Sequence, residues 1–241
     1  MSNCQHFLKI KPENFFAIGC PHFFHKNICR GTSDWDKGYR NFDFPEEMND
    51  QIIYNINKVV PKDGILFILG DGFFGANKEK TIPEIRSRIA CEKIHYLFGN
   101  HCDWLRQHAE FHHLFSSIGE YAEVLVGKQL VCMHHYPMIV WRDSHKGSWM
   151  LHSHCHATLP EDNECKRLEV SEDCQYYNQN GVLVKTDSYG VQHLKYKKTL
   201  PILPHAELLH PAFCPYSYEK IQLLVSFKEN YPVDHHDSET S

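Results

Sequence analysis

The chain has 241 residues, of which 42% are hydrophobic and 13% aromatic, and its formal net charge is −5 at pH 7. This length can bury one sizeable core, so we expect a single domain over residues 1–241, with a core over about 15–160 and a C-terminal extension over about 161–241. The acidic balance and the lack of a Lys/Arg cluster argue against long nucleic acid as a partner. A small phosphorylated substrate still fits, because metal ions can supply positive charge locally.

The first part of the chain opens with a short lead-in over residues 1–14. The apolar run at residues 15–19, followed by a polar turn, predicts a buried strand. Apolar residues at three- and four-residue spacings predict a helix over residues 45–60, which Pro61 ends. A second apolar run predicts the next strand at residues 65–70.

The alternation of helix and strand continues beyond this point. A helix is predicted over about 82–90, with Pro83 in its first turn, where a missing backbone N–H is tolerated. A third apolar run predicts a strand at residues 93–98, and an amphipathic pattern predicts a helix over residues 103–115.

The middle of the chain is rich in strands. Residues 121–126 and 128–133 predict two strands joined tightly at Gly127, and the apolar run at 149–151 predicts another. Turn signals between alternating segments indicate a hairpin-like excursion over residues 175–200.

A final helix is predicted over residues 217–227, with Ser217 as its N-cap. Strand–helix alternation followed by a strand-rich middle predicts an α/β fold of two packed mixed β-sheets flanked by helices. In open α/β sheets, ligands bind beyond the carboxyl ends of the strands, where loops converge.

The ten cysteines are expected to be reduced thiols in a cytoplasmic protein. No CxxC pair occurs, and the N-terminus lacks the basic and apolar regions of a secretory signal. No apolar run approaches the roughly 20 residues that a membrane-spanning helix needs. We therefore expect no membrane partner, and the sequence leaves the oligomeric state open.

Five of the apolar runs end in residues that can bind a metal. These residues are, in chain order, Cys20 with His22, Asp71, Asn100 with His101, His135, and His154 with His156. Neutral imidazoles suit zinc, manganese or iron, and a short carboxylate can bridge two ions about 3.5–4 Å apart. Taken singly, each motif is also an ordinary turn or a buried side chain. The ordered set instead predicts one polynuclear metal site.

In order, the motifs CPHFFHKN, GD, GNH, HHYP and HSHCH resemble those of the calcineurin-like metallophosphoesterases, whose pattern is DxH, GD, GNHD or GNHE, H and GHxH. The similarity covers residues 15 to about 160 and is closest to small prokaryotic and phage-encoded members. It implies a four-layer αββα sandwich that binds two divalent ions of manganese, zinc or iron. It also implies hydrolysis of a small phosphomonoester or phosphodiester by in-line attack of a metal-bound hydroxide.

Carried over to this chain, the resemblance divides the ligands between two ions that share one aspartate. The residues around the first ion would be His22, Asp71 and His156. The residues around the second ion would be Asp71, Asn100, His135 and His154. His101 would act as the general acid, while His25 and Asn27 would contact the substrate, although plain loop capping explains these last two equally well.

Four positions depart from the family's pattern. Cys20 stands at the Asp of DxH, and a softer, larger thiolate would favour zinc or iron, hold the first ion weakly, or mark its loss. Cys102 follows GNH in place of an acid, which would orient His101 less well. Ser153 replaces the Gly of GHxH, and His134 replaces the Ser of SHYP.

Two functions from different classes are compatible with these residues. The first is a metal-dependent phosphoesterase, which the complete set of imidazoles and the amide favours. The second is a binding module that has kept the fold and one metal or none but has lost turnover, which Cys20 favours.

Overall fold

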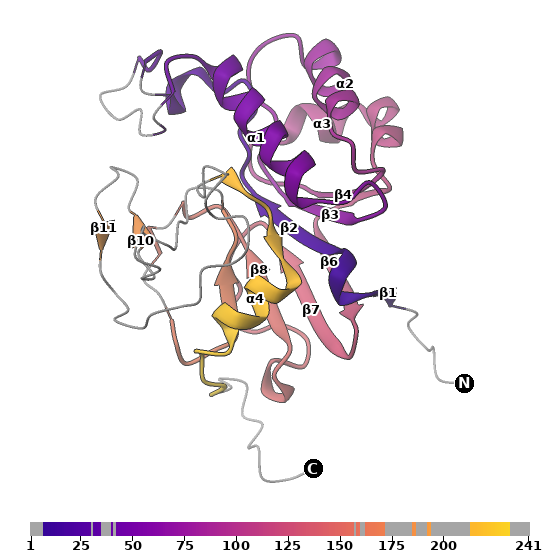
Figure 1. Cartoon of the computed structure of the whole chain (residues 1–241), viewed down its shortest axis with the longest axis vertical. Helices are drawn as coiled ribbons and strands as arrows, with labels where there is room; N and C mark the ends of the chain where they lie inside the picture. Colours follow the sequence, from indigo (N-terminus) through magenta and orange to yellow (C-terminus); the bar gives the residue numbers. More distant parts are fainter. Residues whose placement is uncertain are drawn as a thin grey trace.

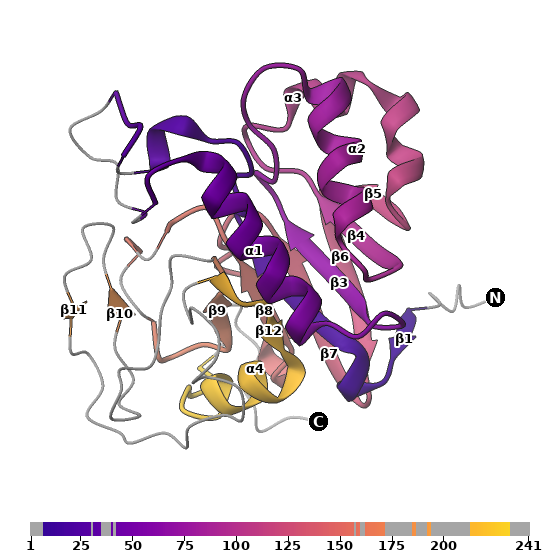
Figure 2. The same cartoon turned by 45° about the horizontal axis from the view of Figure 1, so that its top comes forward.

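The computed structural model describes most of the first 171 residues and part of the remainder. The described residues are 7–29, 31–34, 40, 42–156, 158–159, 162–171, 185–186, 192–193 and 213–231. Two five-stranded mixed sheets pack face to face, as Figures 1 and 2 show. The predicted α/β class with two mixed sheets flanked by helices is therefore confirmed.

The first sheet contains, in spatial order, β1 (Leu8–Ile10), β6 (Tyr121–Val126), β7 (Gln129–His134), β8 (Trp149–His152) and β9 (Arg167–Glu169). Strands β6 and β7 form an antiparallel hairpin. Strand β1 runs parallel to β6, β8 runs parallel to β7, and β9 runs parallel to β8. The carboxyl ends of β7 and β8 therefore lie at the same edge.

The second sheet contains, in spatial order, β12 (Tyr216–Ser217), β2 (Phe15–Gly19), β3 (Ile65–Leu69), β4 (Lys93–Leu97) and β5 (Ser117–Gly119). Strands β2 to β5 are parallel, and only the short β12 runs against β2. A separate antiparallel pair joins β10 (Lys185–Thr186) to β11 (Gln192–His193). This pair falls within the predicted hairpin-like excursion, most of which lies outside the described residues.

Four α-helices complete the described fold. Helices α1 (Pro45–Val59), α2 (Lys78–Arg88) and α3 (Asp103–Gln107) lie on one side of the second sheet (Figure 2). Helix α4 (Tyr218–Val225) follows β12, and the hydroxyl of its N-cap Ser217 accepts a hydrogen bond from the Lys220 N–H. Short 3₁₀ helices are η1 (Pro12–Asn14), η2 (Lys26–Ile28), η3 (Ala109–Leu114) and η4 (Ser144–Lys146).

The central strand β2 shows how the layers are held together. Its side chains alternate, so Phe15 and Ala17 face the first sheet while Phe16 and Ile18 face the helices, and all are buried. The inter-sheet core also takes up the apolar face of α4. The outer face of the first sheet is covered in part by Trp141, which packs on Cys132 and Met150.

The structure departs from the expected elements at several points. Helix α2 begins at Lys78, so Pro83 lies inside it and the prediction of Pro83 in the first turn was wrong. The first turn is exposed and polar, and apolar periodicity cannot mark such a start. The helix predicted over 103–115 is instead α3 followed by η3, with a break at His108. The lead-in also contributes β1 and η1, and the short strands β5, β9 and β12 were not predicted.

The other predicted strands and the helix over 45–60 agree with the structure to within one residue at each end. Among the described residues, no helix has the length and apolar character needed to cross a membrane.

Candidate metal centre

The five loops that carry the predicted ligands meet where the two sheets come together. Strands β2, β3 and β4 run in one direction, so the loops after them share one edge, and the loops after β7 and β8 share another. The two edges are joined by a hydrogen bond of 2.8 Å from the Gly19 N–H to the Val170 carbonyl. Ligands from distant parts of the chain are thereby brought into one cluster.

Two glycines make this close approach possible. A Cβ on Gly19 would lie 2.4 Å from the Cβ of Ser153, which belongs to the loop after β8. Gly70 has a φ of +81°, and a Cβ there would lie 2.3 Å from Nδ1 of His135. Any larger residue at either position would push the two sets of loops apart.

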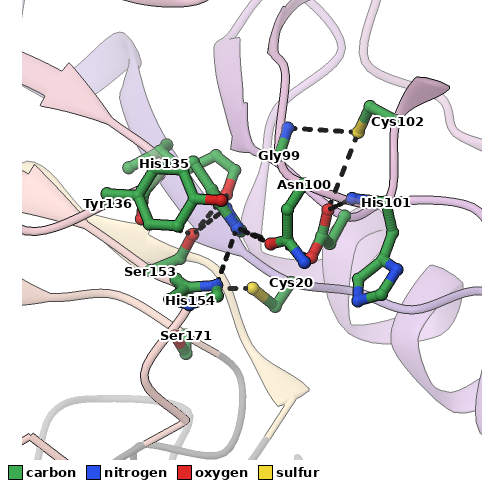
Figure 3. A network of polar contacts seen from close by, with 12 residues as sticks. Cys20, Gly99, Asn100, His101, Cys102, His135, Tyr136, Ser153, His154 and Ser171 are labelled. Carbon is green, nitrogen blue, oxygen red and sulfur yellow. Dashed lines mark hydrogen bonds and ion pairs between the residues drawn. The ribbon is translucent and has the colours of Figure 1, made fainter.

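His135 lies at the centre of the cluster and is fully buried (Figure 3). Its Nδ1 lies 3.1 Å from the Leu69 carbonyl, which can only accept, so this bond makes Nδ1 the protonated nitrogen. In the neutral imidazole the opposite nitrogen, Nε2, carries the lone pair, and it lies 2.9 Å from Asn100 Oδ1, 3.1 Å from His154 Nδ1 and 3.5 Å from Asp71 Oδ2. Several ligand atoms that converge in this way form a typical cation site.

His22 supplies independent evidence that a cation fits here. The residue is 6% exposed, and within the described part of the chain both of its ring nitrogens are buried without a hydrogen-bond partner. Burial, with further contributions from His156 and Arg40, lowers the pKa of His22 well below its ordinary value. A neutral imidazole with an unused lone pair is the form that binds a metal ion. Its ring lies 4.8 Å from that of His156.

Two groups of side chains are close enough to hold an ion each. One consists of Cys20, His22 and His156, and the other of Cys20, Asp71 and His135; within each group the ligand atoms all lie within 4.8 Å of one another. Cys20 is therefore the residue common to both groups, whereas the resemblance had implied that the two ions share Asp71. The donor set of thiol, imidazoles and carboxylate fits a divalent transition metal, and it does not identify which one.

Cys20 has the electrostatic surroundings of a ligand. Burial alone would raise the pKa of its thiol, but His156 and His135 more than offset this effect and lower the pKa to about 7. The opposite holds for His135: burial would lower its pKa, but Cys20 and Asp71 outweigh burial and raise the pKa above its ordinary value. The Cys20 Sγ also accepts a hydrogen bond from the His154 N–H at 3.4 Å.

Asp71 and His101 are linked through the backbone. The His101 N–H donates to Asp71 Oδ1 at 2.9 Å, which fixes the carboxylate while its other oxygen faces His135. The side chains of Asn100 and His101 are at the surface, and the His101 ring lies 5.1 Å from that of Phe74. His101 thus stands at the mouth of the cluster.

Cys102 lies behind the site and not beside the His101 ring. Its Sγ accepts a hydrogen bond from the Gly99 N–H at 3.1 Å, contacts the Tyr96 hydroxyl at 3.3 Å and donates to Asp71 Oδ1 at 3.8 Å. Burial raises the pKa of this thiol, so it stays a donor. The side chain therefore orients Asp71, whereas the sequence had directed attention to His101.

His25 and Asn27 serve as loop caps. The His25 Nδ1 accepts from the Ile28 N–H at 3.0 Å, and the Asn27 Oδ1 accepts from the Asp34 N–H at 3.2 Å. Burial, followed by Arg40, lowers the pKa of His25 to about 4. These contacts support the capping interpretation, and they do not test a contact with substrate.

No role was assigned from the sequence to three residues that lie near the ligands. The Ser153 hydroxyl donates to the Leu69 carbonyl and lies 3.0 Å from His135 Nδ1, so it helps to orient that ring. Tyr136 packs against His135 and His154, with ring centroids 5.0 and 4.6 Å away. Phe74 contacts the rings of His22 and His25, in addition to His101. Ser153 and Tyr136 lie within the motifs HSHCH and HHYP, and Phe74 was signalled only by its place shortly after Asp71.

Comparison with known proteins assigns no family. The chain matches no protein-family model. It is 33% identical over 89 residues to the uncharacterized protein MJ1445 of Methanocaldococcus jannaschii, a match that covers 37% of this chain and 47% of that protein. The chain thus spans about half the length of this curated relative. A solved structure from Aquifex aeolicus, the protein of unknown function AQ665, is similar with a TM-score of 0.46 and 17% identity over 68% of this chain and 91% of that one.

Proposed function

We propose that the protein is a metal-dependent phosphoesterase that hydrolyses a small phosphomonoester or phosphodiester. The observation that carries this proposal is the convergence of Asn100, His154 and Asp71 on Nε2 of His135. It is supported by the buried His22, whose ring nitrogens have no partner among the described residues. A purely structural core has no need for such a set of facing lone pairs.

Two divalent ions at this site would polarise the phosphoryl oxygens, activate a water and neutralise the charge that develops during hydrolysis. The chain's own residues would bind and orient the reactants. His101 would hold a proton at the mouth of the site for the leaving oxygen, because its imidazole is exposed while its backbone is bonded to Asp71. Asn100 would contribute its amide oxygen to the ligand set.

The charge of the chain supports a small substrate. A net charge of −5 repels a long polyanion, whereas a single phosphoryl group meets mainly the local cations of the site.

The pKa values of His22 and His25 are both lowered, which keeps these imidazoles neutral and available to cations or hydrogen-bond donors at neutral pH.

The test combines metal analysis with a generic assay on the purified full-length protein. Bound manganese, zinc and iron are measured, and turnover of p-nitrophenyl phosphate and of bis-p-nitrophenyl phosphate is followed with each metal. His135→Ala should lose both metal and turnover. His134→Ala is the matched control, because its ring is half-buried and its Nδ1 accepts from the Tyr136 N–H outside the cluster. Equal metal content in both variants would contradict the proposal.

The second candidate function is a binding module that holds metal without turnover. Cys20 favours this function. It is buried and belongs to both candidate groups, and its thiol is a softer ligand than the oxygen donor of a carboxylate. Stoichiometric metal with no hydrolysis of either ester would select this function over the first.

A further inference from the structure

A guanidinium group is buried directly behind the loop that carries Cys20 and His22. Arg40 is 2% exposed, although arginine is rarely buried in proteins. Its Nη1 donates to the Pro21 carbonyl at 2.7 Å, and its Nη2 donates to the Cys20 carbonyl at 2.9 Å. Two consecutive carbonyls of the ligand loop are thus held by one side chain.

The ligand loop has an unusual backbone that needs such support. Cys20 and His22 have φ angles of +53° and +57°, and Phe24 follows with +61°. Side chains other than glycine rarely adopt this left-handed conformation, and surrounding contacts must over-determine it. The turned carbonyls of Cys20 and Pro21 point inward, where a buried acceptor requires a donor.

Arginine suits this position better than lysine. Its planar fork presents two N–H groups in a fixed geometry, which can bond two neighbouring carbonyls at once. The same guanidinium also contacts Met48 Sδ at 3.5 Å and lies 5.4 Å from the centre of the Phe213 ring. It therefore connects the ligand loop to α1 and to the segment just before β12.

We infer that Arg40 is a positioning residue, whose two hydrogen bonds to the Cys20 and Pro21 carbonyls hold the side chains of Cys20 and His22 together for one ion. The inference rests on the metal site of the proposed function. It adds a residue that touches neither ion nor substrate and acts through the backbone of the ligand loop.

The chain provides a matched control in Arg86. This side chain also donates to three carbonyls, those of Leu114 at 2.9 Å, Glu92 at 3.0 Å and Ile89 at 3.1 Å. None of these carbonyls belongs to the candidate metal centre. Both Arg86→Met and Arg40→Met should lower the stability of the fold. Only Arg40→Met should also change the placement of the candidate metal ligands.

The first measurement is the affinity for zinc and cobalt in the parent, Arg40→Met, Arg40→Lys and Arg86→Met. Loss of a group that orients ligands typically weakens metal binding by about 10- to 100-fold. We expect that loss in both Arg40 variants and not in Arg86→Met. The absorption band from thiolate to cobalt, which reports Cys20 directly, should weaken in the same two variants.

Arg40→Lys separates positioning from charge. Lysine keeps the positive charge near His22 but cannot bond both carbonyls with the same geometry. Parent-like affinity in Arg40→Lys would overturn the inference, because charge alone would then be sufficient. The lysine variant also keeps the test usable if Arg40→Met does not fold.

The second measurement needs no metal. Amide hydrogen exchange of the metal-free protein reports the ligand loop, in which the His22 N–H donates to the Asp71 carbonyl and the Phe23 N–H to the Gly72 carbonyl. These amides should exchange faster in both Arg40 variants than in Arg86→Met. If the parent binds no metal, the proposed function fails, while this exchange result still decides the role of Arg40. Unchanged exchange in both Arg40 variants would overturn it.

Discussion

Cys20 and Cys165 both lie near a carboxylate, but their thiols respond in opposite ways. At Cys165, burial and a hydrogen bond of 3.1 Å to Asp162 raise the pKa to about 11. At Cys20, burial acts in the same direction, yet His156 and His135 lower the pKa to about 7. Neighbouring groups, and not burial, distinguish the candidate ligand from the structural thiol.

The two carboxylates in these regions show the same contrast. Asp162 is matched by protein donors, since it accepts from Arg167 at 3.1 Å and from the Glu164 N–H at 2.9 Å, in addition to Cys165. Asp71 has protein donors on Oδ1 only, from the His101 N–H and the Cys102 thiol, while its Oδ2 faces His135 within a cluster of candidate ligand atoms. Candidate ligand atoms that face one another therefore indicate a metal site better than a count of polar residues does.

The largest expected effect is that of Asp71→Asn, compared with Asp162→Asn. The first change removes a charge from the ligand set, so turnover of an aryl phosphate should fall to the background rate and the metal content should fall with it. The second should leave both unchanged, since Asp162 is already matched by protein donors. Comparable turnover in Asp71→Asn and the parent would show that the two-metal mechanism is wrong.

His101→Ala should reduce the rate by about 10²–10⁴-fold, as expected for loss of a general acid. Metal content should stay at the parent level, because the proposed work of His101 is proton transfer. The loss should shrink for esters with very acidic leaving groups, which need little protonation. His113→Ala, at an exposed imidazole that contacts the Glu110 carbonyl, is the control. Equal losses for all leaving groups would contradict the role.

Cys20→Asp should change which metal supports turnover, raising activity with manganese or magnesium and weakening the preference for zinc. Hard oxygen ligands suit the former ions, and thiolate suits softer ones. Rates and bound metal are compared for the parent, Cys20→Asp, Cys20→Ala and the distant control Cys165→Ser. Identical results for the parent and both Cys20 variants would place this residue outside the site.

The smallest expected effect concerns pH and stability at Asp162. Burial would raise the pKa of this carboxyl, but the contacts of Cys165 and the Glu164 N–H lower it. A carboxyl whose pKa is lower in the folded than in the unfolded state stabilises the fold at any pH above its unfolded pKa. This stabilisation is lost as the pH falls through the pKa of the folded state. The Asp162 side chain is 37% exposed, so solvent screens its contacts, and Asp162→Asn should lower the melting temperature by only about 1–3 °C at pH 7.

That difference should shrink as the pH falls below the ordinary pKa of the carboxyl, because the folded carboxylate then becomes protonated. Thermal unfolding of the parent and the variant across this range provides the measurement. A difference that does not shrink at all as the pH falls would show that the carboxylate charge is not its source.

Local patterns were sufficient for much of the fold. The buried runs of β2, β3 and β4 and the periodic helix α1 were predicted because the signal lies within a few consecutive residues. The short strands β1, β9 and β12 were not predicted, since they have two or three residues each and form through pairing with distant partners. Helix α2 began earlier than predicted because its first turn carries no apolar signal.

For the site, residue type and position after a strand identified the candidate ligands from the sequence, because parallel strands place their following loops at a common edge. Which ligands meet was decided only by the packing of the two sheets. The contact between Cys20 and the His154 N–H joins residues 134 positions apart. The contacts of Cys102 with Asp71 and of Arg40 with the ligand loop could not be predicted for the same reason. They depend on how segments distant in the sequence pack together, and no local sequence pattern specifies such contacts.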